Sequence, residues 1–167
     1  RQDSLAALLD AARRAGAEQA DALIVQGASL GVSRRLGAIE ELERAETTDI
    51  GLRVFIGARI ATVSGTDATP AGFAALAERA VAMARVVPED RFTPLPDAPP
   101  PAPHALDLDD GAEPTAEALL ARAAIAEEAA LAVAGVSNSE GASAGWSRGV
   151  RALATARGFF GEYARSS

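Results

Sequence analysis

The most regular alternation of apolar and polar residues lies between Asp49 and Asp67. Four aliphatic residues occupy every second position at its start: Ile50, Leu52, Val54 and Ile56. A period of two is typical of a β-strand with one buried face. A turn at Gly57-Ala58-Arg59 leads into a second β-branched run, Ile60, Thr62 and Val63. We therefore expect 49–67 to form the central hairpin of a sheet.

Three other stretches have the spacing of apolar residues that is typical of helices. The predicted helices are Ser4–Ala15, the segment from Thr69-Pro70 to Val87-Pro88, and Thr115–Ala134. Asp3 or Ser4 is the expected N-cap of the first helix, and Gly16 and Gly135 are expected to end the first and the third. The residues of the third helix expected to face inward are Leu119, Leu120, Ala123, Ala126, Ala130 and Val133.

The remaining patterned segments predict strands. Before the hairpin these are 22–26, 30–36 and 39–45, and the first two are joined by Gly27-Ala28-Ser29, which suggests a bulge or bend in one longer strand. A turn is expected at Leu36-Gly37-Ala38, and the polar strand after it suits a sheet edge. Residues 149–157 and 159–167 predict two more strands around a turn at Arg157-Gly158.

The order of these elements predicts an α+β fold. We expect an antiparallel, curved sheet with about three helices packed on one face. The order is helix, four-strand meander, helix, long loop, helix, and two or three strands. The whole chain, 1–167, is expected to be one domain, with 88–114 as an extended Pro- and Asp-rich connection. Because the sequence begins at Arg1 and stops inside a strand pattern, we expect it to be a fragment of a chain that continues into a further C-terminal part.

Composition narrows the range of functions. The 167 residues are 49% apolar but only 4% aromatic, so the core is expected to consist of small aliphatic side chains. The net charge is −7, which argues against direct binding to nucleic acid or to an anionic membrane. Without cysteine there is no disulfide and no thiol chemistry, and no apolar run is long enough to span a bilayer.

Candidate chemistry is sparse. His104 is the only histidine, so a site of two or three histidines is impossible, and a solvated loop residue is the favoured interpretation. Asp107, Asp109 and Asp110 before Gly111 lack the spacing and the distal glutamate of a calcium loop. The acidic group Glu40, Glu41, Glu43 and Glu46 is either a solvated edge strand, which we favour, or a docking face for a basic partner.

The segment from Ser137 to Gly145 is rich in hydroxyls and glycines, but no base accompanies it. Trp146 next to it serves equally well as an interface residue or as a structural anchor. We find neither a phosphate-binding lysine motif nor a glycine-rich dinucleotide loop. The sequence therefore predicts no catalytic, cofactor-binding or metal-binding residue, and no cofactor, in this chain.

Several segments together resemble the PmbA (TldE) branch of the TldD/PmbA family, in its N-terminal half. They are 35–43 (RLGAIEELE), 50–67 (IGLRVFIGARIATVSGTD), 137–143 (SNSEGAS) and 157–163 (RGFFGEY). Their order and spacing cover nearly the whole chain, and the long Pro/Asp connection fits the same pattern.

The resemblance implies a role in a cytoplasmic, heterodimeric metalloprotease. In that family the TldD branch carries a His-Glu-x-x-x-His zinc motif in its C-terminal part, and the PmbA branch acts with that catalytic partner. The expected partners are therefore a TldD-type subunit, which would hold the zinc, and an unfolded peptide or small protein substrate. Direct binding to nucleic acid or to a membrane is not expected.

Three functions remain open at this point. The leading hypothesis is a non-catalytic module for subunit assembly and peptide enclosure, with 39–45 or the terminal strands as sheet edges to which an extended peptide could add. The alternative is a stand-alone interaction module linked to DNA gyrase modulation. An independent hydrolase is the third.

Overall fold

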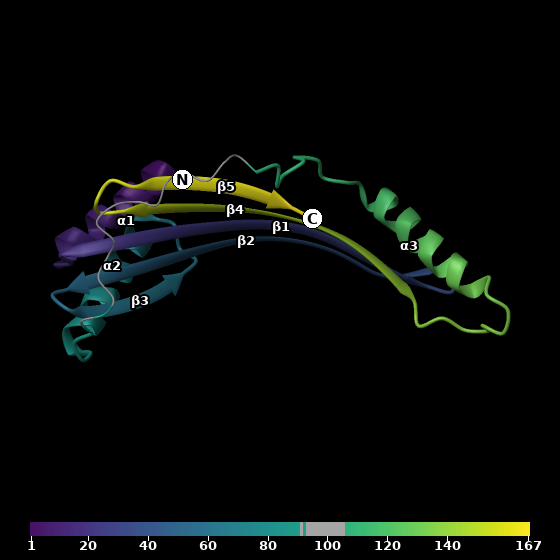
Figure 1. Cartoon of the computed structure of the whole chain (residues 1–167), viewed down its shortest axis with the longest axis horizontal. Helices are drawn as coiled ribbons and strands as arrows, with labels where there is room; N and C mark the ends of the chain where they lie inside the picture. The colour runs from purple at the N-terminus through teal and green to yellow at the C-terminus, as the bar shows by residue number, and fades with distance from the viewer. Residues whose placement is uncertain (91, 93–105) are drawn as a thin grey trace. The chain divides into compact units, whose positions relative to one another are not determined.

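The computed structural model describes residues 1–90, 92 and 106–167. Within them the order is α1 (Gln2–Ala15), β1 (Gln19–Arg35), β2 (Ala38–Ile56), β3 (Arg59–Gly65), α2 (Pro70–Val86), α3 (Ala116–Leu131), β4 (Ala142–Thr155) and β5 (Phe160–Ser166) (Figure 1). The five strands of this described part form one open antiparallel sheet. The predicted α+β class is therefore confirmed.

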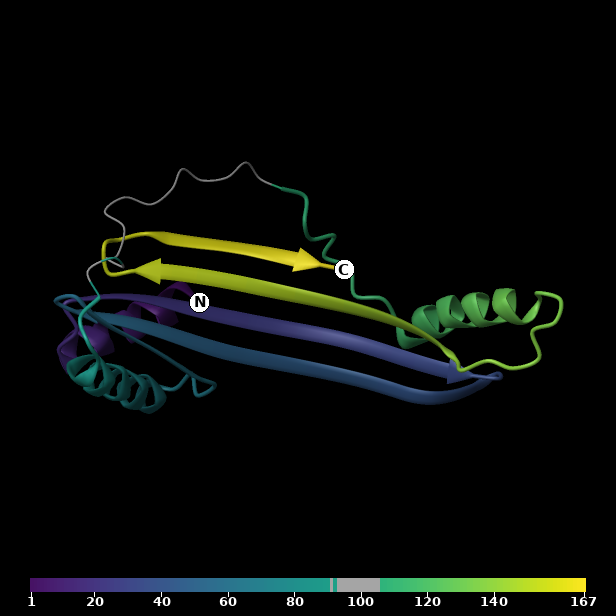
Figure 2. The same ribbon diagram turned by 60° about the horizontal axis from the view of Figure 1, so that its bottom comes forward.

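The strands lie in the order β3-β2-β1-β4-β5, with β1 between β2 and β4 (Figure 2). The hairpin of β2 and β3 forms with Ile50 opposite Gly65 and Ile56 opposite Arg59. It was expected at the centre of the sheet, and this was wrong, because β3 is the outermost strand on its side. The chain leaves β3 for α2 instead of pairing again, so the later strands β4 and β5 add beyond β1.

The meander before α2 has three strands rather than the four that were expected. Residues 22–26 and 30–36 belong to one strand, β1, as the longer-strand interpretation allowed. Residues 39–45 and 50–56 are likewise joined in β2. The linking segment Glu46-Thr47-Thr48-Asp49 contains neither glycine nor proline, so nothing in it interrupts an extended backbone.

The described chain divides into two compact units. The first comprises 1–26, 48–106 and 150–163, and the second comprises 27–47, 107–149 and 164–167. Four of the strands contribute residues to both units.

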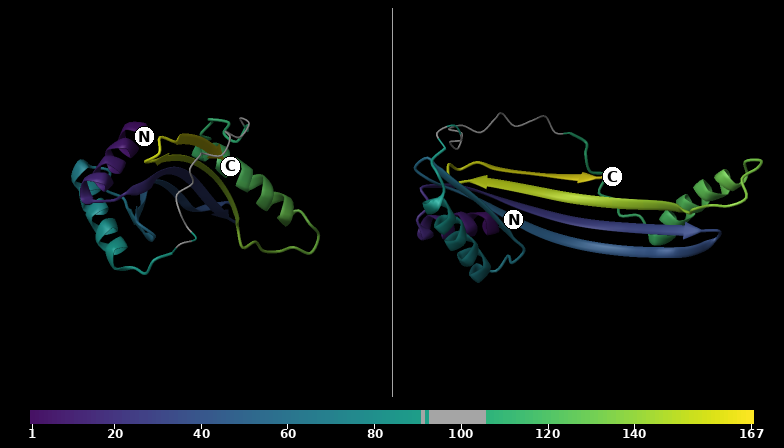
Figure 3. Two further views of the ribbon diagram at one scale, coloured as in Figure 1. Left: turned by 60° about the vertical axis from the view of Figure 1, so that its left-hand side comes forward. Right: turned by 90° about the horizontal axis from the view of Figure 1, so that it is seen from below.

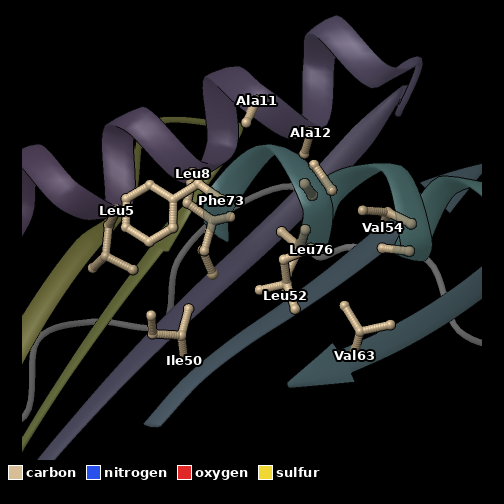
Figure 4. Close-up of a cluster of buried hydrophobic side chains, with 14 of the residues drawn as sticks. Leu5, Leu8, Ala11, Ala12, Ile50, Leu52, Val54, Val63, Phe73 and Leu76 are labelled. Atoms are coloured by element: carbon tan, nitrogen blue, oxygen red, sulfur yellow. The ribbon is translucent and has the colours of Figure 1, made fainter. Parts of the chain in front are cut away.

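The first unit has its core between two helices and the sheet. α1 and α2 lie side by side (Figure 3). Leu5 and Leu8 of α1 and Phe73 of α2 gather over Ile50 and the neighbouring strand residues (Figure 4). Around them pack many small residues, among which Ala12, Ala22, Ala77, Ala80, Ala84 and Ala152 are fully buried. As composition predicted, this is an aliphatic core in which alanines allow helix and sheet to approach closely.

Local signals set the ends of these helices. α1 begins two or three residues before its expected cap at Asp3 or Ser4. Arg1 occupies the N-cap position, and its carbonyl accepts the amide of Leu5 at 2.9 Å. Gly16 ends α1 as expected, in a left-handed conformation at φ 109°. The Thr69 hydroxyl accepts the amide of Gly72 at 3.1 Å and caps α2, with Pro70 at the first helical position.

The second unit has a smaller core beneath α3. Leu119 packs with Leu30 and Val32 of β1 and with Ala144 and Trp146 of β4. The inward face expected for α3 was partly wrong, because Ala126, Ala130 and Val133 are exposed and the helix already ends at Leu131. The buried line is Leu119, Ala123 and Glu127, which are spaced by four residues.

Candidate functional site

The candidate site is the part of β2 that pairs with β1 on one side but not with β3 on the other. β3 pairs with residues 50–56 alone, and β1 lies on the other side of β2. The segment from Ala38 to Thr47, all of it in the second unit, therefore has no strand neighbour on one side among the described residues. Every residue of it except the half-buried Ala45 is exposed. The predicted edge strand at 39–45 is confirmed.

Beside this edge the sheet has a hollow of about 320 Å³. The side chains that surround it come from β1, β2 and β4: Gly31, Ser33, Glu41, Glu43, Ser143 and Gly145. Val32 and Ala144 also contribute to the lining, although both belong to the cluster beneath α3. Since side chains alternate along a strand, the hollow lies on the sheet face opposite α3.

Glycine keeps the floor of this hollow open. A Cβ placed on Gly31 would meet no atom within 4 Å, and one placed on Gly145 would meet the carbonyl oxygen of Leu30 at 3.7 Å. A larger residue would therefore fit at either position without a steric clash. The two glycines instead leave the backbone accessible on a face that larger side chains would cover.

The charge around the hollow is negative. Glu40, Glu41 and Glu43 are exposed, and no ion pair is recorded for them within the described residues. The only cation on this stretch, Arg44, lies 2.6 Å from Glu46 and 3.1 Å from Glu113. These carboxylates raise the pKa of Arg44, and the hydrogen bond that Arg44 donates to Glu113 contributes most. Arg44 therefore does not offset the charge of the other three glutamates.

A buried carboxylate holds the turn at the end of the hairpin β1–β2. Leu36 and Gly37 both have positive φ, 48° and 84°, as in the tight turns that join antiparallel strands. Oε1 of Glu127 accepts the amide of Leu36 at 2.7 Å, and Oε2 accepts the amide of Gly37 at 3.4 Å. Arg34 lies 3.4 Å from the same carboxylate. The hydrogen bond from Leu36 is the largest cause that lowers the pKa of Glu127.

Asp109 and Asp110 form polar contacts that hold their segment against the last two strands. Asp109 accepts three hydrogen bonds from Arg148, at 3.0, 2.9 and 2.7 Å, and these lower its pKa. Asp110 accepts the hydroxyl of Ser166 at 3.0 Å. The carbonyl of Leu108 accepts the amide of Ser166 at 2.9 Å. This segment is thus fastened along β4 and β5 by polar contacts, whereas the side chains of Leu106 and Leu108 are exposed.

The other residues that the sequence analysis singled out do not come together in one site within the described part of the chain. His104 lies outside the described residues. In the segment 137–145, the carbonyl of Ser139 accepts Nε of Arg35 at 2.8 Å, and only Ser143 and Gly145 reach the hollow. Trp146 packs in the small core, as an anchor would. The hollow and the buried role of Glu127 were not foreseen, since both depend on residues distant in sequence.

Two further observations concern the described part of the chain as a whole. It contains no group of three or more His, Cys, Asp or Glu side chains placed to share a metal ion. None of its helices has the length and apolar character needed to cross a bilayer. What the site does offer is a row of free backbone groups bordered by negative charge, which suits recognition of an extended chain.

Solved structures share this fold. TldE from Thermococcus kodakarensis superposes with a TM-score of 0.82 at 14% identity, over 98% of this chain and 37% of that one. A candidate modulator of DNA gyrase from Bacteroides thetaiotaomicron gives 0.76 at 16% identity, over 99% of this chain and 38% of that one. A second candidate modulator of DNA gyrase, from Thermotoga maritima, superposes with a TM-score of 0.68 at 11% identity, over 99% of this chain and 37% of that one. The chain thus spans little more than a third of the length of these relatives.

The sequence comparisons point the same way. None of the curated proteins compared with this sequence matches it. Residues 20–84, which run from β1 into α2, match the family model described as PmbA/TldA metallopeptidase domain 1. This match, together with the shared fold, agrees with the resemblance to the PmbA/TldD family found in the sequence.

Proposed function

We propose that this chain is the N-terminal domain of a non-catalytic, PmbA/TldE-like subunit in a heterodimeric metalloprotease of the cytoplasm. Its role would be assembly with a TldD-type subunit and enclosure of an unfolded peptide. The uncovered edge of β2 carries this proposal, because an exposed row of backbone groups binds another chain by adding a strand. The fold shared with TldE supports the choice of branch.

The zinc of such an enzyme would belong to the partner. The described residues bring no set of metal ligands together, so they do not fit a catalytic zinc site. We therefore assign no chemical step to this chain. Its contribution would be to position polypeptide, either that of the partner subunit or that of the substrate.

The proposal is tested with the full-length subunit and its TldD-type partner. Two edge residues, Ile39 and Leu42, are 59% and 54% exposed and can be replaced without disturbing a core. We expect Ile39→Asp/Leu42→Asp to reduce either co-elution of the two subunits or cleavage of an unfolded peptide. Ile125→Asp on α3, also exposed, is the matched control. Unchanged assembly and unchanged cleavage in the edge variant, and in a subunit that lacks this domain, would refute the proposal.

A second candidate function is a stand-alone interaction module linked to DNA gyrase. It is favoured by the two relatives described as candidate gyrase modulators. The net charge of −7 favours contact with a protein over contact with DNA. Capture of purified gyrase by this chain alone, without a TldD-type subunit, would favour this function over the first.

A further inference from the structure

The free edge of β2 lacks the usual protection against strand addition. Exposed edges are commonly blocked by lysine, proline, a bulge or a covering loop. Residues 38–47 contain neither lysine nor proline, and β1 is the only described strand beside them, because β3 pairs with residues 50–56 alone. At about 3.4 Å per residue, ten residues offer room for a peptide of eight to ten residues.

The charge on the edge discriminates between possible occupants. A second copy of the chain paired along the same edge would bring Glu40, Glu41 and Glu43 close to equivalent carboxylates. Like charges on neighbouring strands are destabilising, and Arg44 is already engaged by two glutamates of its own chain. A basic segment would instead meet carboxylates that form no ion pair with any other described residue. Charge complementarity therefore favours a basic extended segment over self-association.

The hollow indicates where the basic side chains would go. A residue on an added strand lies about 5 Å from the residue opposite it, here Glu41 or Glu43. The side chain of arginine is long enough to pass across β2, and Gly31 leaves the space beyond it open. There the five N–H donors of the guanidinium would find carboxylates and the hydroxyl of Ser33 as acceptors.

We propose that residues 38–47 bind an extended peptide segment as an added strand, and that Glu41, Glu43 and the adjacent hollow select arginine at alternate positions of that segment. This inference rests on the proposed function and specifies the chemistry of the segment that the domain would take. It goes further in naming the residues that choose between sequences.

The experiment measures binding of labelled nine-residue peptides to the whole chain by fluorescence anisotropy. The probe alternates threonine and arginine. Two further peptides carry citrulline or glutamate in place of arginine, and a fourth is N-methylated on alternate residues so that it cannot pair with a strand. We expect the arginine peptide to bind roughly fivefold more tightly than the citrulline peptide. The glutamate and N-methylated peptides should show no binding, and added salt should weaken the preference.

The variants decide whether the hollow is responsible. Glu41→Gln/Glu43→Gln should remove the preference for arginine over citrulline, whereas Glu78→Gln/Glu128→Gln, at two exposed positions elsewhere, removes the same charge and should retain it. Equal affinity for arginine and citrulline, equal loss in both double variants, or no binding of any peptide would overturn the inference. If the preference exists but Ile39→Asp/Leu42→Asp and a subunit that lacks this domain both assemble and cleave normally with a TldD-type subunit, the proposed function fails and the selectivity stands.

Discussion

Glu127 shows how a single residue joins two distant parts of the chain. Its side chain is almost fully buried, and it accepts amide hydrogens from a turn some ninety positions earlier in the sequence. Buried carboxylates are costly unless they are paired and hydrogen-bonded, and this one is both, through Arg34 and the two amides. The turn in return gains acceptors for backbone groups that point out of the hairpin.

The depressed pKa of Glu127 predicts a specific pH dependence. Its ordinary value is 4.5 and the folded value is lower, so its contribution to stability is complete above pH 4.5 and disappears as the pH falls through the folded pKa. Glu127→Gln should therefore be less stable than the wild type at pH 7, and the difference should shrink toward pH 3. Urea unfolding at both pH values measures this. For Glu128→Gln, at an exposed position, the difference in stability from the wild type should not shrink toward pH 3 in this way.

Gly72 lies so close to the backbone of Asp67 that a larger residue does not fit at this position. A Cβ at this position would lie 2.5 Å from the carbonyl oxygen of Asp67, which is part of the backbone and cannot swing aside. We expect Gly72→Ala to lower the free energy of unfolding by about 1–3 kcal/mol, measured by chemical denaturation. Gly31→Ala, where the added carbon meets nothing within 4 Å, should change it by no more than about 0.5 kcal/mol. Similar losses in both variants would show that crowding is not the cause.

At the scale of elements, α1 is held by a few fully buried leucines. Leu8 has no exposed surface and contacts the sheet core, whereas Leu9 beside it is only half-buried. Leu8→Ala should therefore cost about 3 kcal/mol of unfolding free energy, through lost burial and the cavity left behind. Leu9→Ala makes the same chemical change and should cost clearly less. Thermal and urea unfolding of the pair provide the measurement, and equal losses would contradict the assigned inward face.

The elements themselves were mostly predictable because their signals are local. Thr69-Pro70 and Gly16 mark helix ends through caps that involve only neighbouring residues. The inward face of α3 was harder to predict, since alanine is compatible with either face and gives the helix little apolar asymmetry. Only packing against Leu30 and Val32 selected the line through Leu119 and Ala123, and the same packing placed a glutamate inside.

At the scale of the whole molecule, each compact unit has its own hydrophobic cluster. One is centred on Leu8 and Leu52, the other on Leu119. We expect Leu119→Ala to raise amide hydrogen exchange mainly in the second unit, and Leu8→Ala mainly in the first. Mass-spectrometric exchange at neutral pH distinguishes the two. Uniform loss of protection in both units by either variant would show that the units open together.

The sequence by itself determined the class of fold, the aliphatic character of the core and the polar edge strand. Each of these depends on the period or composition of a continuous stretch. Only the tertiary structure decided that β1 lies at the centre, that β3 leaves 38–47 uncovered, and that Gly31, Glu43 and Gly145 border one hollow. The reason is physical: strand order and shared surfaces arise from pairings between distant segments, and the periodicity of one segment carries no information about its neighbours.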